Sequence, residues 1–197
     1  MIPRQFVLST AVLLAVAISM SLYLWQLRGR ELLNPKPLRA VEHVIPPASG
    51  PTEKVTIYVA HDDTGELRPQ SVSVPLSSGR QQRAEDVLAA LVSIYVAKNS
   101  PHPLAPGSEI RNVYLVGPGV AVIDVNSDFL DGQTSGILAE ELTVVSLIQT
   151  LSANVPDLIR VKILAQGKER ETLAGHADLS SFYEVSEVAE VAKQLSL

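Results

Sequence analysis

The feature that most constrains this chain is an apolar stretch near its N-terminus. The 23 positions from Gln5 to Leu27 contain no charged side chain and are mostly leucine, valine, alanine and isoleucine. About 20 apolar residues, at about 1.5 Å each along a helix, cross the roughly 30 Å of a membrane's hydrocarbon core. Arg4 precedes the stretch and Arg28 follows it. The sequence therefore predicts a transmembrane anchor over residues 1–30, with a cleaved signal peptide as the alternative.

Charge gives conflicting signals about the side of the membrane on which the rest of the chain lies. Positive side chains are more frequent after the apolar stretch (Arg28, Arg30, Lys36, Arg39) than before it, which favours an N-terminus outside the cytoplasm. Long domains, however, are translocated largely regardless of nearby charge. We therefore predict a single-pass protein of the cell membrane with its domain on the extracytoplasmic side, in conflict with the local charge rule.

Three further segments follow the predicted anchor. Residues 31–52 are predicted to form an extended linker, because the part from Asn34 to Pro51 contains five prolines, a glycine and no apolar periodicity. Residues 53–179 are predicted to form the folded domain. Residues 180–197 are predicted to form an amphipathic helix, because apolar residues recur there at helical spacing.

Apolar periodicity defines the elements within the predicted domain. Alternation predicts strands over residues 54–59, 71–76, 110–116, 120–125 and 158–165. Helical spacing predicts two helices, the second apolar nearly all round and therefore buried on more than one side. Ser77 or Ser78, and Thr134 or Ser135, are expected to begin these helices. Gly117-Pro118-Gly119 predicts a hairpin. The order predicts an α+β fold with two helices packed on one face of a mostly antiparallel sheet.

Composition excludes several classes of function. The chain has no cysteine, which removes disulfides, thiol catalysis and cysteine-ligated metals. From Gly50 onward, 11 lysine and arginine residues stand against 19 aspartate and glutamate residues. A domain this acidic, without a basic cluster, is not expected to bind nucleic acid.

Two short motifs place a histidine beside carboxylates, His61-Asp62-Asp63 and His176-Ala177-Asp178. Such pairs can serve general acid–base catalysis or metal ligation. A zinc site needs three or four ligands, however, and the chain has only four histidines, two of them in proline-rich segments. It also has no G-x-S-x-G motif. We therefore predict no metal, no cofactor and no enzymatic activity. Asp62, Asp63 and Asp178 are expected to support turns, and His176 to bond to the backbone near the last strand.

The run that begins at Asp124 has part of a calcium-loop pattern. Oxygen-bearing side chains occupy the first, third and fifth positions, as in an EF-hand. The sixth position, which should be glycine, is Phe129, and the twelfth, which should be glutamate, is Ser135. We interpret the run as a turn in which asparagine and aspartate side chains bond to the backbone.

The second predicted helix carries four polar residues of interest. Glu140 and Glu141 lie in its early turns, where acidic side chains suit the helix dipole. Gln149 and Thr150 lie further along. The sequence leaves open whether this second pair makes polar contacts with a neighbouring strand or belongs to an interaction surface.

Taken in order, several segments resemble the GerMN domain family, named from spore germination and sporulation proteins. The resemblance covers roughly Val55 to Asp178, and it is carried by residues 104–108, 122–129, 140, 149–151, 161–164, 167 and 175–178 in that order. Among them, we treat seven as a candidate interaction or structural motif: Asp124, Phe129, Glu140, Gln149, Thr150, His176 and Asp178. The resemblance implies a membrane-tethered extracytoplasmic domain without established catalytic residues, with a fold like that of the ring-building modules of secretion-type assemblies. The chain departs from the family in lacking a lipid-modified cysteine, which puts the transfer of a sporulation role in doubt.

Two functions from different classes remain. The favoured one is a membrane-anchored module for protein–protein assembly or scaffolding in the cell envelope, in a sporulation- or germination-like process, with an envelope protein as partner and possible homo-oligomers. The alternative is a binding module for cell-wall glycan or peptide that assists a wall hydrolase. Glycan sites usually expose aromatic rings, whereas Tyr58, Tyr95 and Tyr114 lie on regular elements where we expect them to face the core.

Overall fold

The computed structural model describes residues 50–196 of the chain. The predicted anchor over residues 1–30 lies outside the described residues, as does the predicted linker except for its last positions. Within residues 50–196, no helix is both long enough and apolar enough to cross a membrane.

The first two strands form an antiparallel hairpin, β1 (Thr52–His61) with β2 (Glu66–Pro75). Alternate residues Val55, Ile57 and Val59 of β1 are buried, as the sequence pattern predicts. β2 begins at Glu66, earlier than predicted, because the turn is tight. Gly65 in this turn has a φ of +70°, which glycine adopts without a steric penalty.

A second sheet contains β3 (Ile110–Val116), β4 (Val120–Val125), β5 (Arg160–Ala165) and β6 (Tyr183–Glu184), in that order. β3 and β4 form the predicted hairpin, and their turn has positive φ at Gly117 (+59°) and Gly119 (+79°). β4 and β5 are parallel. A parallel pair needs a long crossover, which here contains α3 (Ser127–Asp131) and α4 (Ile137–Asn154).

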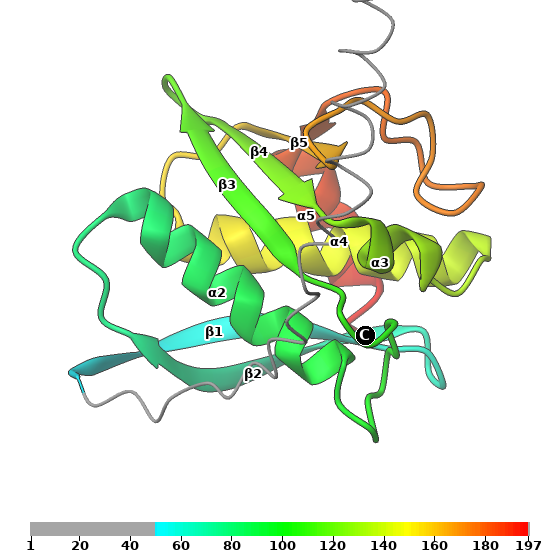
Figure 1. Ribbon diagram of the computed structural model, residues 1–197, viewed down its shortest axis with the longest axis horizontal. Coiled ribbons are helices and arrows are strands. Elements are labelled where there is room, and N and C mark those ends of the chain that lie inside the picture. Colours follow the sequence, from blue (N-terminus) through cyan, green and yellow to red (C-terminus); the bar gives the residue numbers. More distant parts are fainter. Residues whose placement is uncertain (1–49, 197) are drawn as a thin grey trace, which may run out of the picture. The chain divides into compact units, whose positions relative to one another are not determined.

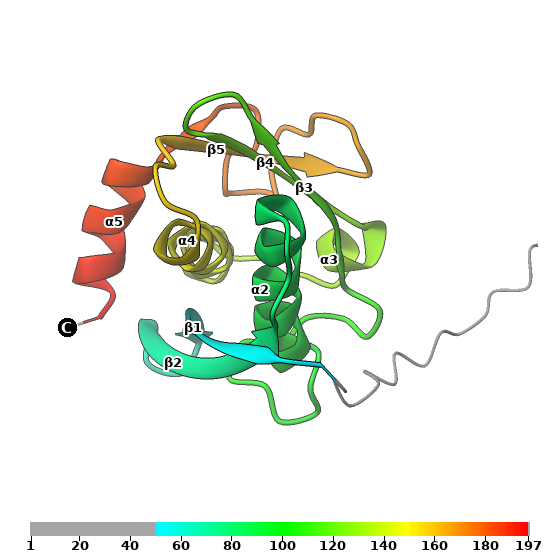
Figure 2. The same cartoon turned by 90° about the vertical axis from the view of Figure 1, so that its left-hand side faces the viewer.

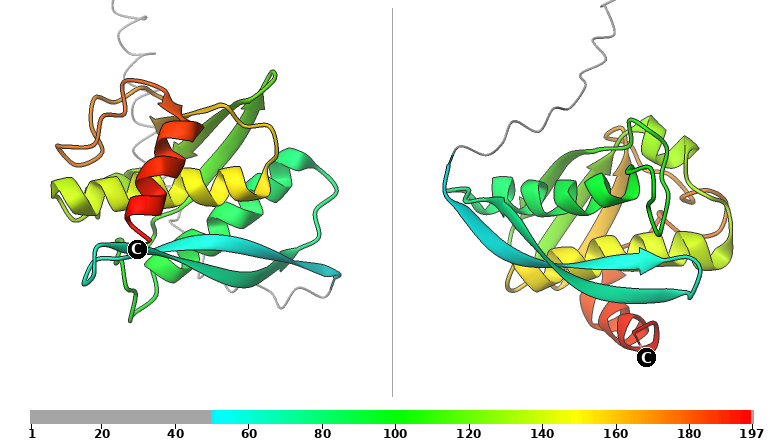
Figure 3. Two further views of the ribbon diagram at one scale, coloured as in Figure 1. Left: turned by 180° about the vertical axis from the view of Figure 1, so that it is seen from behind. Right: turned by 90° about the horizontal axis from the view of Figure 1, so that it is seen from below.

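Two helices lie between the two sheets (Figures 1 and 2). α2 (Arg80–Tyr95) and α4 both pack against β1, and α2 also packs against β3. The C-terminal helix α5 (Val185–Gln194) packs against α4 on the side away from α2 (Figures 2 and 3). α4 is therefore buried on more than one side, as its nearly continuous apolar character predicts.

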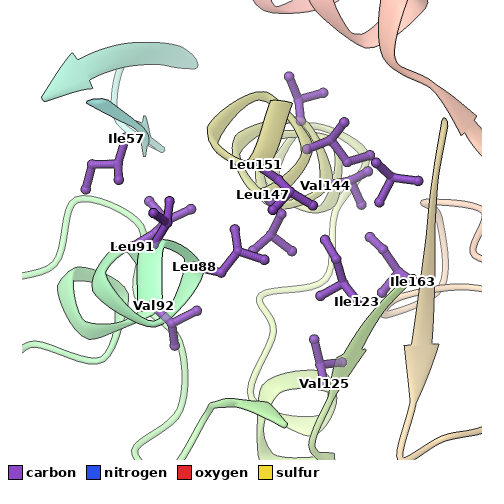
Figure 4. Close-up of a cluster of buried hydrophobic side chains, with 14 of the residues drawn as sticks. Ile57, Leu88, Leu91, Val92, Ile123, Val125, Val144, Leu147, Leu151 and Ile163 are labelled. Atoms are coloured by element: carbon purple, nitrogen blue, oxygen red, sulfur yellow. The ribbon is translucent and has the colours of Figure 1, made fainter. Parts of the chain in front are cut away.

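The predicted α+β class is confirmed, but the prediction of one sheet with both helices on one face is wrong. The strands separate into a two-stranded and a four-stranded sheet. Each sheet needs its apolar face covered, and α2 and α4 cover both because they have apolar residues on opposite sides. Figure 4 shows this core, where Ile57 of β1, Leu88 and Leu91 of α2, and Leu147 and Leu151 of α4 lie together.

The predicted helix starts need two corrections. Gly79 and Gly136, rather than serine or threonine, precede α2 and α4, and neither helix has a side-chain cap of that kind. The turn predicted after β4 contains a short helix, α3, that the apolar pattern of the sequence does not predict. Asn126 caps it, since its Oδ1 accepts a hydrogen bond from the Phe129 N–H at 3.0 Å. The expectation that an asparagine side chain bonds to the backbone there is therefore confirmed.

Candidate functional site

Most of the polar candidates from the sequence lie on or beside α4. Five polar residues of this helix are buried, and they recur every three or four positions along one side: Glu140, Thr143, Ser146, Thr150 and Asn154. Buried polar groups are stable only when they are hydrogen-bonded. The partners of these side chains therefore show whether they serve chemistry or structure.

Glu140 holds the loop that follows β5. Its side chain is fully buried, and Oε2 accepts hydrogen bonds at 2.9 Å from the backbone N–H groups of Ala174, His176 and Ala177. Oε1 lies 2.8 Å from Nδ1 of His176 and accepts a bond from the Gly136 N–H at 3.3 Å. Burial by itself would raise the pKa of the Glu140 carboxyl, but the bonds from His176 and the backbone outweigh it and lower the pKa to about 2. Glu140 is therefore a buried anion that fixes the loop.

His176 and Asp178 do not pair with each other in their side-chain bonds. The His176 ring bonds to Glu140, with 43% of its side chain exposed, rather than to the backbone as predicted. Asp178 accepts bonds from the N–H and Oγ of Ser180, at 2.8 and 2.6 Å, and these bonds lower the pKa of its carboxyl. Asp178 thus supports a turn, as predicted. Because Nδ1 of His176 bonds to Glu140, Nε2 is the ring nitrogen left to bind a solute.

A second histidine–carboxylate pair was not predicted. His102, in the proline-rich loop after α2, lies with Nδ1 2.5 Å from Oδ1 of Asp62 and Nε2 2.7 Å from Oγ1 of Thr143. The Thr143 hydroxyl in turn lies 2.9 Å from Oε1 of Gln133. The order carboxylate, imidazole, hydroxyl is that of a nucleophilic triad. No periodicity in the sequence could have indicated it, because Asp62 and His102 are 40 residues apart.

Burial argues against catalysis by this chain of bonds. His102 and Thr143 are buried, and the Tyr95 ring meets the His102 ring edge-on at a centroid distance of 4.7 Å. A nucleophile must reach its substrate, whereas the Thr143 hydroxyl faces His102 and Gln133 inside the domain. The chain of bonds therefore ties the β1–β2 turn to the loop after α2 and to α4.

Thr150 and Asn154 cover the edge of β1 that does not pair with β2. Three backbone groups of this edge are hydrogen-bonded to side chains. The N–H of Tyr58 donates to Oγ1 of Thr150 at 2.8 Å, and Nδ2 of Asn154 donates to the carbonyl of Thr56 at 2.7 Å. The N–H of Ala60 donates to the hydroxyl of Tyr95 on α2 at 2.9 Å. The sequence left two interpretations of Thr150 open, and the structure shows the first of them, a contact to a neighbouring strand. Gln149 differs, since its Oε1 is buried with no partner within residues 50–196.

Asp124 and Phe129 also have structural positions. Asp124 is buried, with Oδ2 3.0 Å from the Arg111 guanidinium and Oδ1 accepting a bond from the Gly167 N–H at 2.6 Å. Phe129 is fully buried in the core. Across residues 50–196 no group of histidine and acidic side chains is arranged to hold a metal ion.

The outer face of the four-stranded sheet exposes apolar side chains. Register places Tyr114 beside Val122, and Val116 beside Val120, on the face opposite the buried Val113 and Ile123. Phe182 lies over the Arg160 guanidinium of β5 at 4.9 Å. We call the set Tyr114, Val116, Val120, Val122 and Phe182 the sheet patch. Tyr114 is 42% exposed, Val116 55% and Phe182 45%. The expectation that Tyr114 faces the core is wrong.

The family model described as "Germane: Sporulation and spore germination" matches residues 56–171, which is more than half of the chain. The chain belongs to the Germane family. No curated protein matches it. The predicted GerMN resemblance is therefore confirmed.

Two solved structures are similar to this Germane domain, and the first of them shares its fold. The tandem GerMN domains of the sporulation protein GerM from Bacillus subtilis match at 20% identity and a TM-score of 0.54, over 69% of this chain and 47% of that one. The chain thus spans about half the length of that tandem structure. The first GerMN domain of the same protein matches at 19% identity and a TM-score of 0.49, over 66% of this chain and 95% of that one.

The family match divides the candidate residues of the Germane domain. Asp124, Phe129, Glu140 and the Gln149-Thr150 pair lie within residues 56–171. His176, Asp178 and α5 lie after the match ends, although Glu140 bonds the His176 loop to the matched region. The loop and α5 therefore pack onto the matched region and belong to the same folded domain.

Proposed function

We propose that this Germane-family chain is a membrane-tethered, extracytoplasmic module that binds another protein of the cell envelope through the sheet patch, in a sporulation- or germination-like process. The tether is the apolar stretch from Gln5 to Leu27, and the linker holds the domain away from the bilayer. The domain is not an enzyme in this proposal. It recruits or orders its partner.

The observation that carries the proposal is the contrast between buried polar groups and exposed apolar ones. The polar side chains that could take part in acid–base or nucleophilic chemistry, including Glu140, Thr143 and Thr150, bond to groups of the domain itself. Tyr114, Val116 and Phe182 instead present large apolar surfaces to solvent on one face. Contiguous exposed apolar side chains mark interaction sites in soluble domains.

Photo-crosslinking in intact cells tests the proposal. A photoreactive phenylalanine analogue replaces Tyr114 in the full-length protein. In the matched control the same analogue replaces Leu76, which is also exposed but directly follows β2, a strand of the other sheet. We expect a discrete protein adduct from position 114 and none from position 76. Equal adducts from both positions, or none from position 114, would contradict the proposal.

A wall-binding module is the second candidate, favoured by the exposed rings of Tyr114 and Phe182. Exposed aromatic rings can stack on sugars as well as on apolar side chains. The same experiment separates the two. An adduct that a muramidase releases as glycan fragments supports wall binding, whereas an adduct that resists muramidase and yields a second polypeptide supports assembly.

A further inference from the structure

The C-terminal segment of the domain crosses α4 and is bonded at both of its ends. At the first end, β6 pairs with β5, and the Val185 N–H donates to the Ile159 carbonyl at 2.8 Å. At the other end, the Leu195 carbonyl accepts a bond from the Leu67 N–H of β2 at 2.9 Å. The segment therefore links the two sheets across α4, as the red helix in Figure 3 shows. We call residues 183–195 the strap.

Few side chains hold the strap in place. Of the residues of α5, Val188 and Ala192 are buried, whereas eleven residues of α4 are buried. The strand at the first end of the strap, β6, has only two residues. Segments with few buried apolar contacts open at a lower free energy than the core of the same domain. We therefore expect the strap to open while the two sheets, α2 and α4 stay folded.

The side of α4 under the strap contains an unpaired polar group. Leu147 and Leu151 face α2 (Figure 4). Leu142, Val145 and Gln149 recur every three or four positions on a different side of α4, away from α2, where α5 packs (Figure 2). Oε1 of Gln149 is buried and has no hydrogen-bond partner within residues 50–196. A buried acceptor without a donor costs free energy, because water would pair with it. Opening of the strap therefore relieves an unfavourable contact.

The strap also fixes one residue of the sheet patch. Phe182 directly precedes β6, and its ring lies over the Arg160 guanidinium at 4.9 Å. Glu184 of β6 lies opposite Arg160 in register. The chain just before Phe182 is held separately, because Lys162 bonds to the Ser180 carbonyl. Phe182 therefore lies at the hinge, and it loses its fixed position over β5 when β6 leaves that strand.

We infer that the strap opens and closes as one unit and that its closure completes the sheet patch. In the closed state Phe182 forms the β5 side of the patch. In the open state the patch is confined to the side chains of β3 and β4. A partner that contacts Phe182 in the complete patch favours the closed strap. The inference rests on the proposed function, because it names the regulation of the same surface.

Hydrogen exchange of the full chain in mild detergent, followed by NMR, tests whether the strap opens as a unit. Leu67 and Ala60 are a matched pair, since they lie opposite each other in register. The Leu67 N–H bonds to the strap, whereas the Ala60 N–H bonds to Tyr95 of α2. We expect equal protection of the Leu67 and Val185 amides, at least about tenfold below that of Ala60. Protection of Leu67 that equals that of Ala60, or differs from that of Val185, would overturn the inference.

Gln149→Leu tests the contribution of the unpaired acceptor. Leucine keeps an apolar side chain against the strap and buries no acceptor, so the closed state should gain stability. We expect exchange of the Leu67 and Val185 amides to slow by at least about fivefold, with exchange of the Ala60 amide unchanged. Unchanged exchange at Leu67, or equal slowing at Ala60, would contradict this role of Gln149.

A disulfide can lock the strap, because the chain has no cysteine of its own. Ile159 and Val185 are hydrogen-bonded to each other, so the next pair in the register, Arg160 and Glu184, is a non-hydrogen-bonded pair. Cα atoms of such a pair lie about 4.5 Å apart, which a disulfide can span. In Arg160→Cys/Glu184→Cys, oxidation should slow exchange of the Leu67 amide at the far end of the strap. Equal exchange in the oxidised and reduced forms would show that the two ends open independently.

The link to the sheet patch is tested with the crosslink from position 114 in intact cells. Ala192→Glu places a charge in the buried contact of α5 and should open the strap. Lys193→Glu introduces the same side chain at an exposed position and is the matched control. We expect the adduct to fall at least about fivefold in Ala192→Glu, to stay unchanged in Lys193→Glu, and to recover when the oxidised cysteine pair is added to Ala192→Glu.

An unchanged adduct in Ala192→Glu, together with fast exchange of the Leu67 amide, would refute the link between the strap and the patch. A loss that the disulfide does not restore would refute it as well. Protection of the Ala60 amide in each variant checks that the core stays folded. Absence of the adduct in the wild type would contradict the proposed function, whereas hydrogen exchange decides separately whether the strap opens.

Discussion

The buried carboxylate of Glu140 allows a quantitative prediction. In Glu140→Gln, the amide oxygen can still accept from the N–H groups of Ala174, His176 and Ala177. The NH2 group, however, replaces the oxygen that bonds to Nδ1 of His176 and accepts from the Gly136 N–H, and the negative charge is lost. A buried network that loses its charge in this way is destabilised by about 3–5 kcal/mol. We therefore expect Glu140→Gln to lower the free energy of unfolding at pH 7 by an amount in this range.

The pKa of Glu140 gives a second magnitude for the same group. Folding lowers this pKa from 4.5 to about 2. Each pKa unit corresponds to about 1.4 kcal/mol, so the ionised carboxylate contributes about 3 kcal/mol of stability. Because the pKa is lower in the folded state, this contribution is complete above about pH 4.5 and is lost as the pH falls towards 2. The wild type and Glu140→Gln should therefore differ most near pH 7 and converge between about pH 4 and pH 2.

Urea unfolding of the full chain in mild detergent, followed by circular dichroism at several pH values, measures both quantities. The matched control is Glu141→Gln, which changes the next residue of the same helix, where the carboxyl is only half-buried. It should alter the unfolding free energy by no more than about 0.5 kcal/mol. Equal losses in the two variants, or a difference from wild type that does not depend on pH, would refute the assignment of Glu140 as the anion that fixes the loop.

Three further changes test the core and the polar side of α4. Leu142→Ala should lower the free energy of unfolding by about 2–5 kcal/mol in urea titration, because Leu142 is fully buried. The control Ile137→Ala changes an exposed residue of the same helix and should lower it by less than about 0.5 kcal/mol. Thr150→Val leaves the Tyr58 N–H without its acceptor, so it should cost about 1–3 kcal/mol and speed hydrogen exchange at that amide; unchanged exchange would contradict the edge contact. Thr143→Val keeps the side-chain volume but removes the buried hydroxyl. It should lower the stability of the domain and the cellular amount of the protein together. Loss of function at full stability would instead indicate that the hydroxyl takes part in catalysis.

Local pattern predicted the elements of this domain well. Alternation at Val55, Ile57 and Val59 predicts β1, because side chains of a strand with one buried face must alternate. Gly117 and Gly119 predict the β3–β4 turn, because positive φ is least costly for glycine. The continuous apolar character of α4 predicts its burial on several sides. These predictions held because each depends on neighbours within a few positions.

Long-range pairing could not be predicted in the same way. Periodicity shows that a segment is a strand but not which strand it pairs with, so the division into two sheets was missed. The same limit hid the bond between His102 and Asp62, which lie in two loops that only the folded chain brings together. Tyr114 was assigned to the core because alternation gives two faces without showing which of them is covered.

The arrangement of sheet edges explains why association through a face is the open route for this domain. The inner edge of β1 is covered by side chains of α2 and α4, and the Leu67 N–H of β2 donates to the carbonyl of Leu195 at 2.9 Å. β2 also contains Pro69, and proline cannot donate to an added strand.

The second sheet is closed in a similar way. Glu85 occupies the Val113 N–H on β3, and the opposite edge strand, β6, has only two residues. Proteins block edges in these ways to prevent uncontrolled strand pairing. A domain protected along its edges can still expose apolar side chains on a sheet face, because covering a face requires a partner of matching shape. The exposed Tyr114 and Val116 are therefore compatible with a domain that resists aggregation and selects its partner.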